Sequence, residues 1–171
     1  MNKRKWLEKS PEVEPGRKNR MKALSQPRGK TFDEFEVGDE FLTASRTVTE
    51  TDVVTFMHLS GDFNPLHSDE EYMKGTPFKT RIAQGVLSLV FAEGLANQSG
   101  LFEGTTIALL SKSMRFTAPV FIGDTLTLKL KVSGKKESKK PDRGVVTLET
   151  IVFNQKRTTV LEGEWVIMIK R

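Results

Sequence analysis

The sequence is organised around residues 60–67, which read Ser-Gly-Asp-Phe-Asn-Pro-Leu-His. Gly61 and Pro65 both interrupt a helix, so the chain is expected to bend here. A bend brings the side chains of Asp62 and His67 toward one point. A carboxylate and an imidazole that share one water molecule form the arrangement that general acid–base catalysis needs. This stretch is therefore the candidate reaction centre.

The same residues carry a resemblance to a known family. Gly-Asp, Asn-Pro and His follow one another at the spacing that is typical of the MaoC-like dehydratases, the R-specific enoyl-CoA hydratases of the hotdog fold. The resemblance runs from about residue 32 to residue 171, and it includes the segment at Gly85 and the Phe-Thr-Ala-Pro-Val stretch at 116–120. It implies an α+β fold with a single hotdog domain, in which an antiparallel sheet wraps around one buried central helix.

Hydrophobic periodicity predicts the same elements independently. From Gly85 to Ser99 the apolar residues point in nearly every direction around a helix, which predicts a helix buried on all sides. A small domain buries a helix in this way by wrapping a sheet around it. The strands predicted for that sheet are residues 41–48, 105–116, 125–132, 145–153 and 160–169, with strict alternation of apolar and polar residues in the third.

Two short helices are predicted on either side of the bend. Thr49-Glu50-Thr51-Asp52 supplies an N-cap, either Thr49 or Thr51, and an acidic first turn for the helix that leads to Gly61. A second helical piece is expected at residues 68–73, where it begins at a capping residue. The bend is thus held between two helices.

Length and composition restrict the protein class. A chain of 171 residues with 37% hydrophobic residues suits one domain. No run approaches the roughly 18 apolar residues of a membrane span, so no membrane association is expected. There is no cysteine, so the chain has no disulfide framework or thiol chemistry, and the cytoplasm is the expected compartment.

The net charge of +5 is unevenly distributed. Residues 1–30 hold ten Lys or Arg against three Glu, whereas the remainder holds 17 basic and 19 acidic residues. This predicts a basic extended arm at 1–30 and a mildly acidic domain at 31–171, which is not the clustered basic face of a nucleic-acid-binding protein. A mitochondrial transit peptide is the less favoured interpretation of the arm, because of its three glutamates.

The resemblance implies a role for each residue of the motif. Asp62 and His67 would add water across the double bond of a trans-2-enoyl thioester, giving an (R)-3-hydroxyacyl-CoA. Asn64 would orient the water or the catalytic pair, or would only form the turn. The N–H of Gly85, at the start of the buried helix, would form an oxyanion hole, unless this glycine only permits close packing.

Other uses of the same side chains are less favoured. Asp62 and His67 could be a turn residue and a hydrogen-bonded core imidazole. They could also bind a metal together with Asn64, but His58 is the only other histidine and there is no cysteine. No metal or cofactor is therefore expected.

Two positions depart from the family pattern. Gln84 stands where many members have a histidine before the helix glycine, and Glu93 occupies a place where some have a small hydroxyl side chain. An acid on an apolar helix is costly to bury without a partner. Glu93 is expected to pair with Asn97, to face a dimer interface or to recognise a polar acyl group.

Two alternative functions remain open. Some hotdog thioesterases use a carboxylate on the central helix, a role that Glu93 would fill. The third hypothesis is a non-catalytic subunit that binds acyl-CoA. Because single hotdog domains generally pair edge to edge, a homodimer or a dimer of dimers is expected.

The carrier of the acyl group also stays open. The phosphates of CoA need cationic partners, and Lys112 and Arg115 in one predicted strand are the candidates. The basic loop at residues 135–143 is another, although such a charge run is usually a solvated hairpin. An acyl carrier protein would equally suit a basic rim.

Overall fold

The computed structural model describes residues 29–171. The predicted arm at residues 1–30 therefore lies outside the described residues, except for its last two. The N–H of Gly29 donates to the carbonyl of Glu103 at 3.0 Å, and that of Lys30 donates to the carbonyl of Leu101 at 2.9 Å. The sequence predicts Gly29 and Lys30 to be part of the arm, but these hydrogen bonds join both residues to the folded domain.

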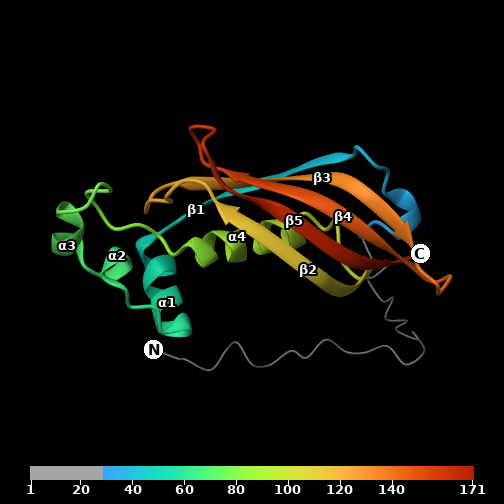
Figure 1. Cartoon of the computed structure of the whole chain (residues 1–171), viewed down its shortest axis with the longest axis horizontal. Helices are drawn as coiled ribbons and strands as arrows, with labels where there is room; N and C mark the ends of the chain where they lie inside the picture. Colours follow the sequence, from blue (N-terminus) through green and yellow to red (C-terminus); the bar gives the residue numbers. More distant parts are fainter. Residues whose placement is uncertain (1–28) are drawn as a thin grey trace, which may run out of the picture.

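One antiparallel sheet forms the body of the described chain, with strand order β1-β3-β4-β5-β2 (Figure 1). All five predicted strands are present, and the third extends five residues further than its alternating pattern. Its alternation predicts burial correctly, because Leu126, Leu128 and Leu130 are fully buried. The strands are β1 (Glu40–Thr47), β2 (Thr106–Phe116), β3 (Thr125–Glu137), β4 (Arg143–Phe153) and β5 (Thr159–Lys170).

The long helix α4 (Gly85–Gln98) lies along one face of this sheet (Figure 1). Its residues Leu87, Phe91 and Leu95 are buried in the core, and each large apolar side chain contributes about 1.5–3 kcal/mol when fully buried. The prediction of burial on every side is wrong for one flank, where Val86 is 50% and Val90 is 45% exposed. The sheet of one chain covers only part of the helix circumference, and this flank has no strand over it.

Three further helices gather at one end of the sheet (Figure 1), and a 3₁₀ turn, η1 (Phe32–Glu34), precedes β1. The piece predicted at residues 68–73 is α3, which begins at Glu70 because Asp69 is its N-cap, and an additional short helix, α2, begins at Pro65, where only a bend was predicted. The helices at this end are α1 (Glu50–Ser60), α2 (Pro65–Ser68) and α3 (Glu70–Lys74).

Helix α1 has well-defined ends that place the motif at residues 60–67. Thr49 is its N-cap, as one of the two alternatives predicted: its hydroxyl accepts the Asp52 N–H at 3.2 Å, and the Asp52 carboxylate accepts the Thr49 N–H at 2.9 Å. The helix ends at Gly61, whose φ of 76° lies in the left-handed region that favours glycine. The turn at Gly61 directs the next residue, Asp62, away from the helix axis.

Among residues 29–171, no helix is both long enough and apolar enough to cross a membrane.

Candidate active site

The structure brings Asp62 and His67 together across the bend. Oδ2 of Asp62 lies 3.6 Å from Nε2 of His67. This separation is too long for a direct hydrogen bond, but one water oxygen can contact both atoms. The Asp62 side chain is 46% exposed, whereas His67 is buried, so the shared position is open to solvent on the side of the carboxylate.

A backbone carbonyl sets the tautomer of His67. Nδ1 of the ring lies 2.7 Å from the carbonyl oxygen of Ile82. A carbonyl oxygen only accepts, so Nδ1 carries a hydrogen and donates it. In the neutral ring Nε2 is then the unprotonated acceptor. That nitrogen faces Asp62 and is suited to take a proton from a water molecule.

Neighbouring backbone groups hold Asp62 in place. Its Oδ1 accepts the N–H of Asn64 at 3.3 Å, and its own N–H donates to the hydroxyl of Ser60 at 3.2 Å. These contacts leave Oδ2 free to face His67. The carboxylate is therefore positioned by local turns rather than by a distant partner.

Gly85 lies in the same hollow as His67. A cavity of about 320 Å³ is lined by both residues, together with Phe78, Ser88 and Phe116 among others. Gly85 is the first residue of α4, so its N–H has no carbonyl one turn earlier in the helix to bind, and the helix dipole adds positive potential there. The hollow is thus bordered by the His67 ring and by the first residue of α4.

The packing role considered for Gly85 is also present. A Cβ at this position would lie 3.1 Å from two ring carbons of Phe116, which is tighter than ordinary van der Waals contact. The absent side chain lets the start of α4 approach the end of β2. Close packing and an N–H without an intrahelical partner coexist at this residue.

Ser88 is a residue that the sequence reasoning missed. It is buried and lines the cavity that also contains His67 and Gly85. A spacing of three residues places Ser88 and Gly85 on one side of the first helical turn. This spacing is the feature of the sequence from which Ser88 could have been predicted to line the cavity. The hydroxyl adds a polar group to a wall that is otherwise largely apolar.

Asn64 and Gln84 have structural contacts. The Oδ1 of Asn64 accepts the N–H of Leu66 at 3.1 Å, so this side chain caps α2 and forms the turn. Gln84 is buried, and its Nε2 lies 3.5 Å from the carbonyl oxygen of Val53 on α1. Gln84 therefore joins the start of α4 to α1 and does not line the cavity of His67.

Glu93 and Lys112 form an ion pair between α4 and β2. The Lys112 Nζ also lies 3.8 Å from the centre of the Trp165 ring, close enough for a cation–π interaction. Asn97 donates to the backbone carbonyl of Glu93 at 3.0 Å, so the predicted Glu93–Asn97 pairing involves the backbone and not the carboxylate. None of these residues lines the cavity of His67.

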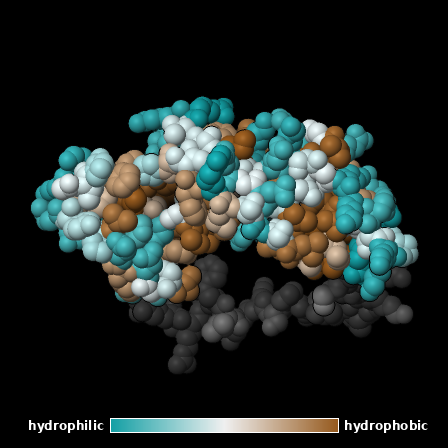
Figure 2. Space-filling view, viewed as in Figure 1, coloured by the Kyte–Doolittle hydropathy of each residue, from teal (hydrophilic) through white to brown (hydrophobic). Residues whose placement is uncertain are grey.

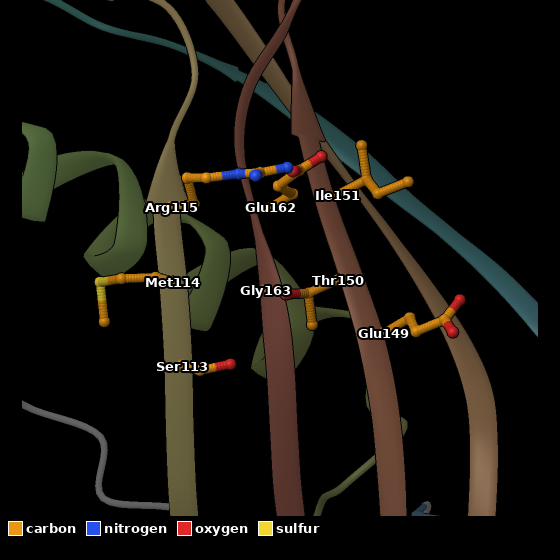
Figure 3. Close-up of a pocket in the computed structure, with 8 residues that line it drawn as sticks. All are labelled: Ser113, Met114, Arg115, Glu149, Thr150, Ile151, Glu162 and Gly163. Carbon is orange, nitrogen blue, oxygen red and sulfur yellow. The ribbon is translucent and has the colours of Figure 1, made fainter.

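Arg115, the other candidate for a CoA phosphate, is on the outer face of the sheet. In Figure 3, Met114 points toward α4, whereas Arg115 and Ser113 project from the opposite face of the sheet. Arg115 pairs there with Glu162, beside a shallow hollow of about 420 Å³ that contains no residue of the 60–67 motif. Both candidate cations, Lys112 and Arg115, thus already have a carboxylate partner.

The basic stretch at residues 135–143 forms the end of β3, the loop after it and the first residue of β4, and it lies at the other end of the sheet from α1, α2 and α3 (Figure 1). Strand β3 alone spans about 40 Å at 3.3 Å per residue. Within one chain, this loop is far from the cavity of His67. The surroundings of the loop give no support to a phosphate contact there.

Comparison with known proteins gives consistent matches. The family model described as the MaoC like domain matches residues 34–154. An (R)-specific enoyl-CoA hydratase of Rhodospirillum rubrum is 35% identical over 138 residues, which make up 81% of this chain and 90% of that protein.

Solved structures agree with this match. An unliganded R-hydratase from Pseudomonas aeruginosa has a TM-score of 0.69 and 38% identity, covering 81% of this chain and 84% of that one. A Mycobacterium tuberculosis protein with a double hotdog fold has a TM-score of 0.70 at 22% identity, covering 85% of this chain and 46% of that one. The second likeness concerns the fold alone, and the described chain corresponds to a single hotdog unit.

Proposed function

The chain belongs to the family of MaoC-like dehydratases, and we propose that it adds water to trans-2-enoyl-CoA to form (R)-3-hydroxyacyl-CoA, together with the reverse dehydration. The observation that carries this proposal is the 3.6 Å separation between Oδ2 of Asp62 and Nε2 of His67. It is supported by the cavity that His67 shares with Gly85. The matched (R)-specific hydratase supports the same reaction and its stereochemistry.

The proposed reaction uses His67 as base and then as acid. A water molecule held by both side chains donates one hydrogen bond to Asp62 and one to Nε2 of His67. As the water oxygen bonds to C3 of the enoyl group, its proton moves to Nε2. The enolate formed at C2 then takes a proton from Nε2, which restores the neutral imidazole. One oxygen and two hydrogens have been added, and the enzyme is unchanged.

Charge develops at two places during the reaction, and a backbone group stabilises each of them. During the addition, negative charge develops on the thioester oxygen, and the N–H of Gly85 at the start of α4 is the proposed donor to it. Positive charge develops on His67, where Nδ1–H donates to the carbonyl oxygen of Ile82. Both groups are held by the fold before substrate binds, so little reorganisation is needed.

The thioesterase alternative has no comparable support. It requires a carboxylate of α4 that can attack the thioester or activate water. The carboxylate of Glu93 is paired with Lys112 and does not line the cavity of His67. The hydratase is therefore the function that we propose.

We also propose that two copies pair through β2. This edge strand has 11 residues, and its outer backbone groups face no other strand among the described residues. Figure 2 shows hydrophobic surface on the flank where β2 and α4 lie, and an exposed apolar edge favours pairing with another chain. Exposed apolar residues of this flank are Val86, Val90, Leu109, Leu110, Met114 and Phe116. Sedimentation velocity should give twice the mass of the 19.3 kDa chain.

The carrier and compartment are part of the proposal. We favour CoA as the carrier because the matched relative is named for an enoyl-CoA substrate. The proposed reaction needs only water and the side chains described above, and no metal or cofactor enters it. The proposed compartment is the cytoplasm, because a chain without cysteine has no disulfide that its reducing conditions could break.

A direct assay tests the reaction class. Crotonyl-CoA is mixed with the protein, and the absorbance of the enoyl thioester is followed. We expect the absorbance to fall and chiral analysis to give the R alcohol. Formation of the S alcohol, or release of free CoA thiol without hydration, would contradict the proposal. Parallel reactions with crotonyl-loaded acyl carrier protein decide between the two carriers.

A further inference from the structure

The ion pair between Glu93 and Lys112 lies in an unusual place. The Lys112 side chain is only 12% exposed, and its charge is held between the Glu93 carboxylate and the Trp165 ring. These residues line a second hollow of about 200 Å³ between α4 and the sheet, whose other walls include Phe102 and Leu109. The Glu93 side chain is 42% exposed, so the pair keeps water on the side of the carboxylate, and such a pair contributes little to stability. The pair therefore invites a functional explanation.

Two contacts show that α4 and β2 run side by side. Gly85 adjoins Phe116 at the cavity of His67, and Glu93 adjoins Lys112 further along. The eight residues between the helix positions rise roughly 12 Å. The four residues between the strand positions span roughly 13 Å. These two lengths agree, so α4 and β2 run alongside each other from one contact to the other, and we call this line of adjacency the seam.

The middle of the seam is apolar. Leu89 lies four residues from both Gly85 and Glu93, so the three residues occupy successive turns of one side of α4. Met114 lies midway between Phe116 and Lys112, and it points toward α4 (Figure 3). Leu89 is partly buried, Met114 is partly exposed, and a methionine adapts readily to a bound chain. The seam thus starts at the catalytic hollow, continues past apolar side chains and ends at two opposite charges.

We propose that the Glu93–Lys112 pair sets the upper length of the acyl chain that the enzyme accepts. This inference rests on the hydratase function, with the thioester oxygen at the N–H of Gly85. An extended chain advances roughly 1.2 Å per bond, so a seam of roughly 12 Å holds about ten bonds. A longer saturated tail must cover the charged pair and remove water from it without offering a hydrogen bond. Chains of up to about ten carbons fit, and longer chains are rejected.

The test measures kcat/KM for a series of trans-2-enoyl-CoA substrates, from crotonyl through octenoyl to dodecenoyl and tetradecenoyl. In the wild-type enzyme we expect a fall of about tenfold or more between octenoyl and dodecenoyl, because the last carbons of dodecenoyl would remove water from the charged pair without offering a hydrogen bond. The double variant E93L/K112M removes both charges and leaves neither one unpaired. Its ratio of dodecenoyl to crotonyl kcat/KM should rise by about tenfold.

A matched control lies on the same strand. Arg115 and Glu162 form an ion pair on the opposite face of the sheet, and the double variant R115M/E162L should leave the dodecenoyl to crotonyl ratio as in the wild type. An equal ratio in the wild type and in a folded E93L/K112M variant would overturn the inference. So would a wild-type enzyme that accepts tetradecenoyl-CoA as well as octenoyl-CoA.

A second measurement needs no variant. Saturated acyl-CoA thioesters cannot be hydrated, so their inhibition of crotonyl-CoA turnover reports binding alone. We expect these thioesters to inhibit the wild-type enzyme more strongly as their chain grows to about ten carbons, and less strongly beyond that length. Inhibition that keeps strengthening would overturn the length limit while the hydratase function stands. Absence of turnover with every enoyl-CoA would instead overturn the proposed function, and this inference with it.

Discussion

Replacing Asp62 by Asn removes the negative charge beside His67 and nearly preserves the shape of the side chain. The amide oxygen can still accept the N–H of Asn64, as Oδ1 does in the wild type at 3.3 Å. The side chain is half exposed, and an exposed ion pair contributes about 0–1 kcal/mol to stability. The variant should therefore fold almost as stably as the wild type.

The expected loss of activity is much larger than this loss of stability. Asp62 holds the attacking water in the proposed reaction, and misplacing a reacting group can cost about a hundredfold, so the D62N variant should lose about a hundredfold in kcat. A hundredfold corresponds to about 2.7 kcal/mol of lost transition-state stabilisation. Hydration of crotonyl-CoA measures the activity, and urea unfolding followed by circular dichroism measures the free energy of unfolding.

Asp69 provides the matched control for this comparison. It is a carboxylate in the adjacent loop, and it accepts the N–H of Tyr72 at 2.9 Å as the N-cap of α3. The D69A variant should lose about 1 kcal/mol of stability. Its kcat should stay close to that of the wild type. The opposite pattern, with D62N active and D69A inactive, would refute the assignment of Asp62 to the reaction.

Two further variants test the first residue of α4 and the N-terminal cap of α1. Gly85→Ala places a methyl group 3.1 Å from the Phe116 ring and beside the proposed donor N–H, so kcat/KM for crotonyl-CoA should fall by about tenfold or more. Unchanged kinetics would show that the donor lies elsewhere. Burial raises the pKa of Asp52, but hydrogen bonds from Thr49 and from Arg46 outweigh it and hold this pKa below its usual value. The ionised carboxylate therefore stabilises the fold near neutral pH, and this contribution is lost as pH falls through the lowered pKa. The difference in unfolding free energy between wild type and D52N should shrink from about pH 6 to about pH 3, and a constant difference would contradict this account.

Local patterns predicted the features that depend on neighbouring residues. The Thr49 cap and the strand alternation at residues 125–132 involve contacts within a few positions. The bend between Asp62 and His67 is also local, because the seven consecutive residues 61–67 contain both groups together with Gly61, which ends α1, and Pro65, which begins α2. For such features the sequence alone is informative, since backbone preferences and side-chain periodicity act over one or two turns.

Only the tertiary structure decided which distant groups meet. The carbonyl that sets the tautomer of His67 belongs to Ile82, fifteen residues away, and Glu93 meets Lys112 across a helix and a strand. The sequence predicted α4 to be buried throughout, yet Val86 and Val90 are half exposed, since apolar periodicity does not show how much of a helix one sheet covers. The sequence therefore determined the strands, the long helix and the bend at residues 60–67, whereas long-range packing decided the walls of the cavity and the charged end of the seam.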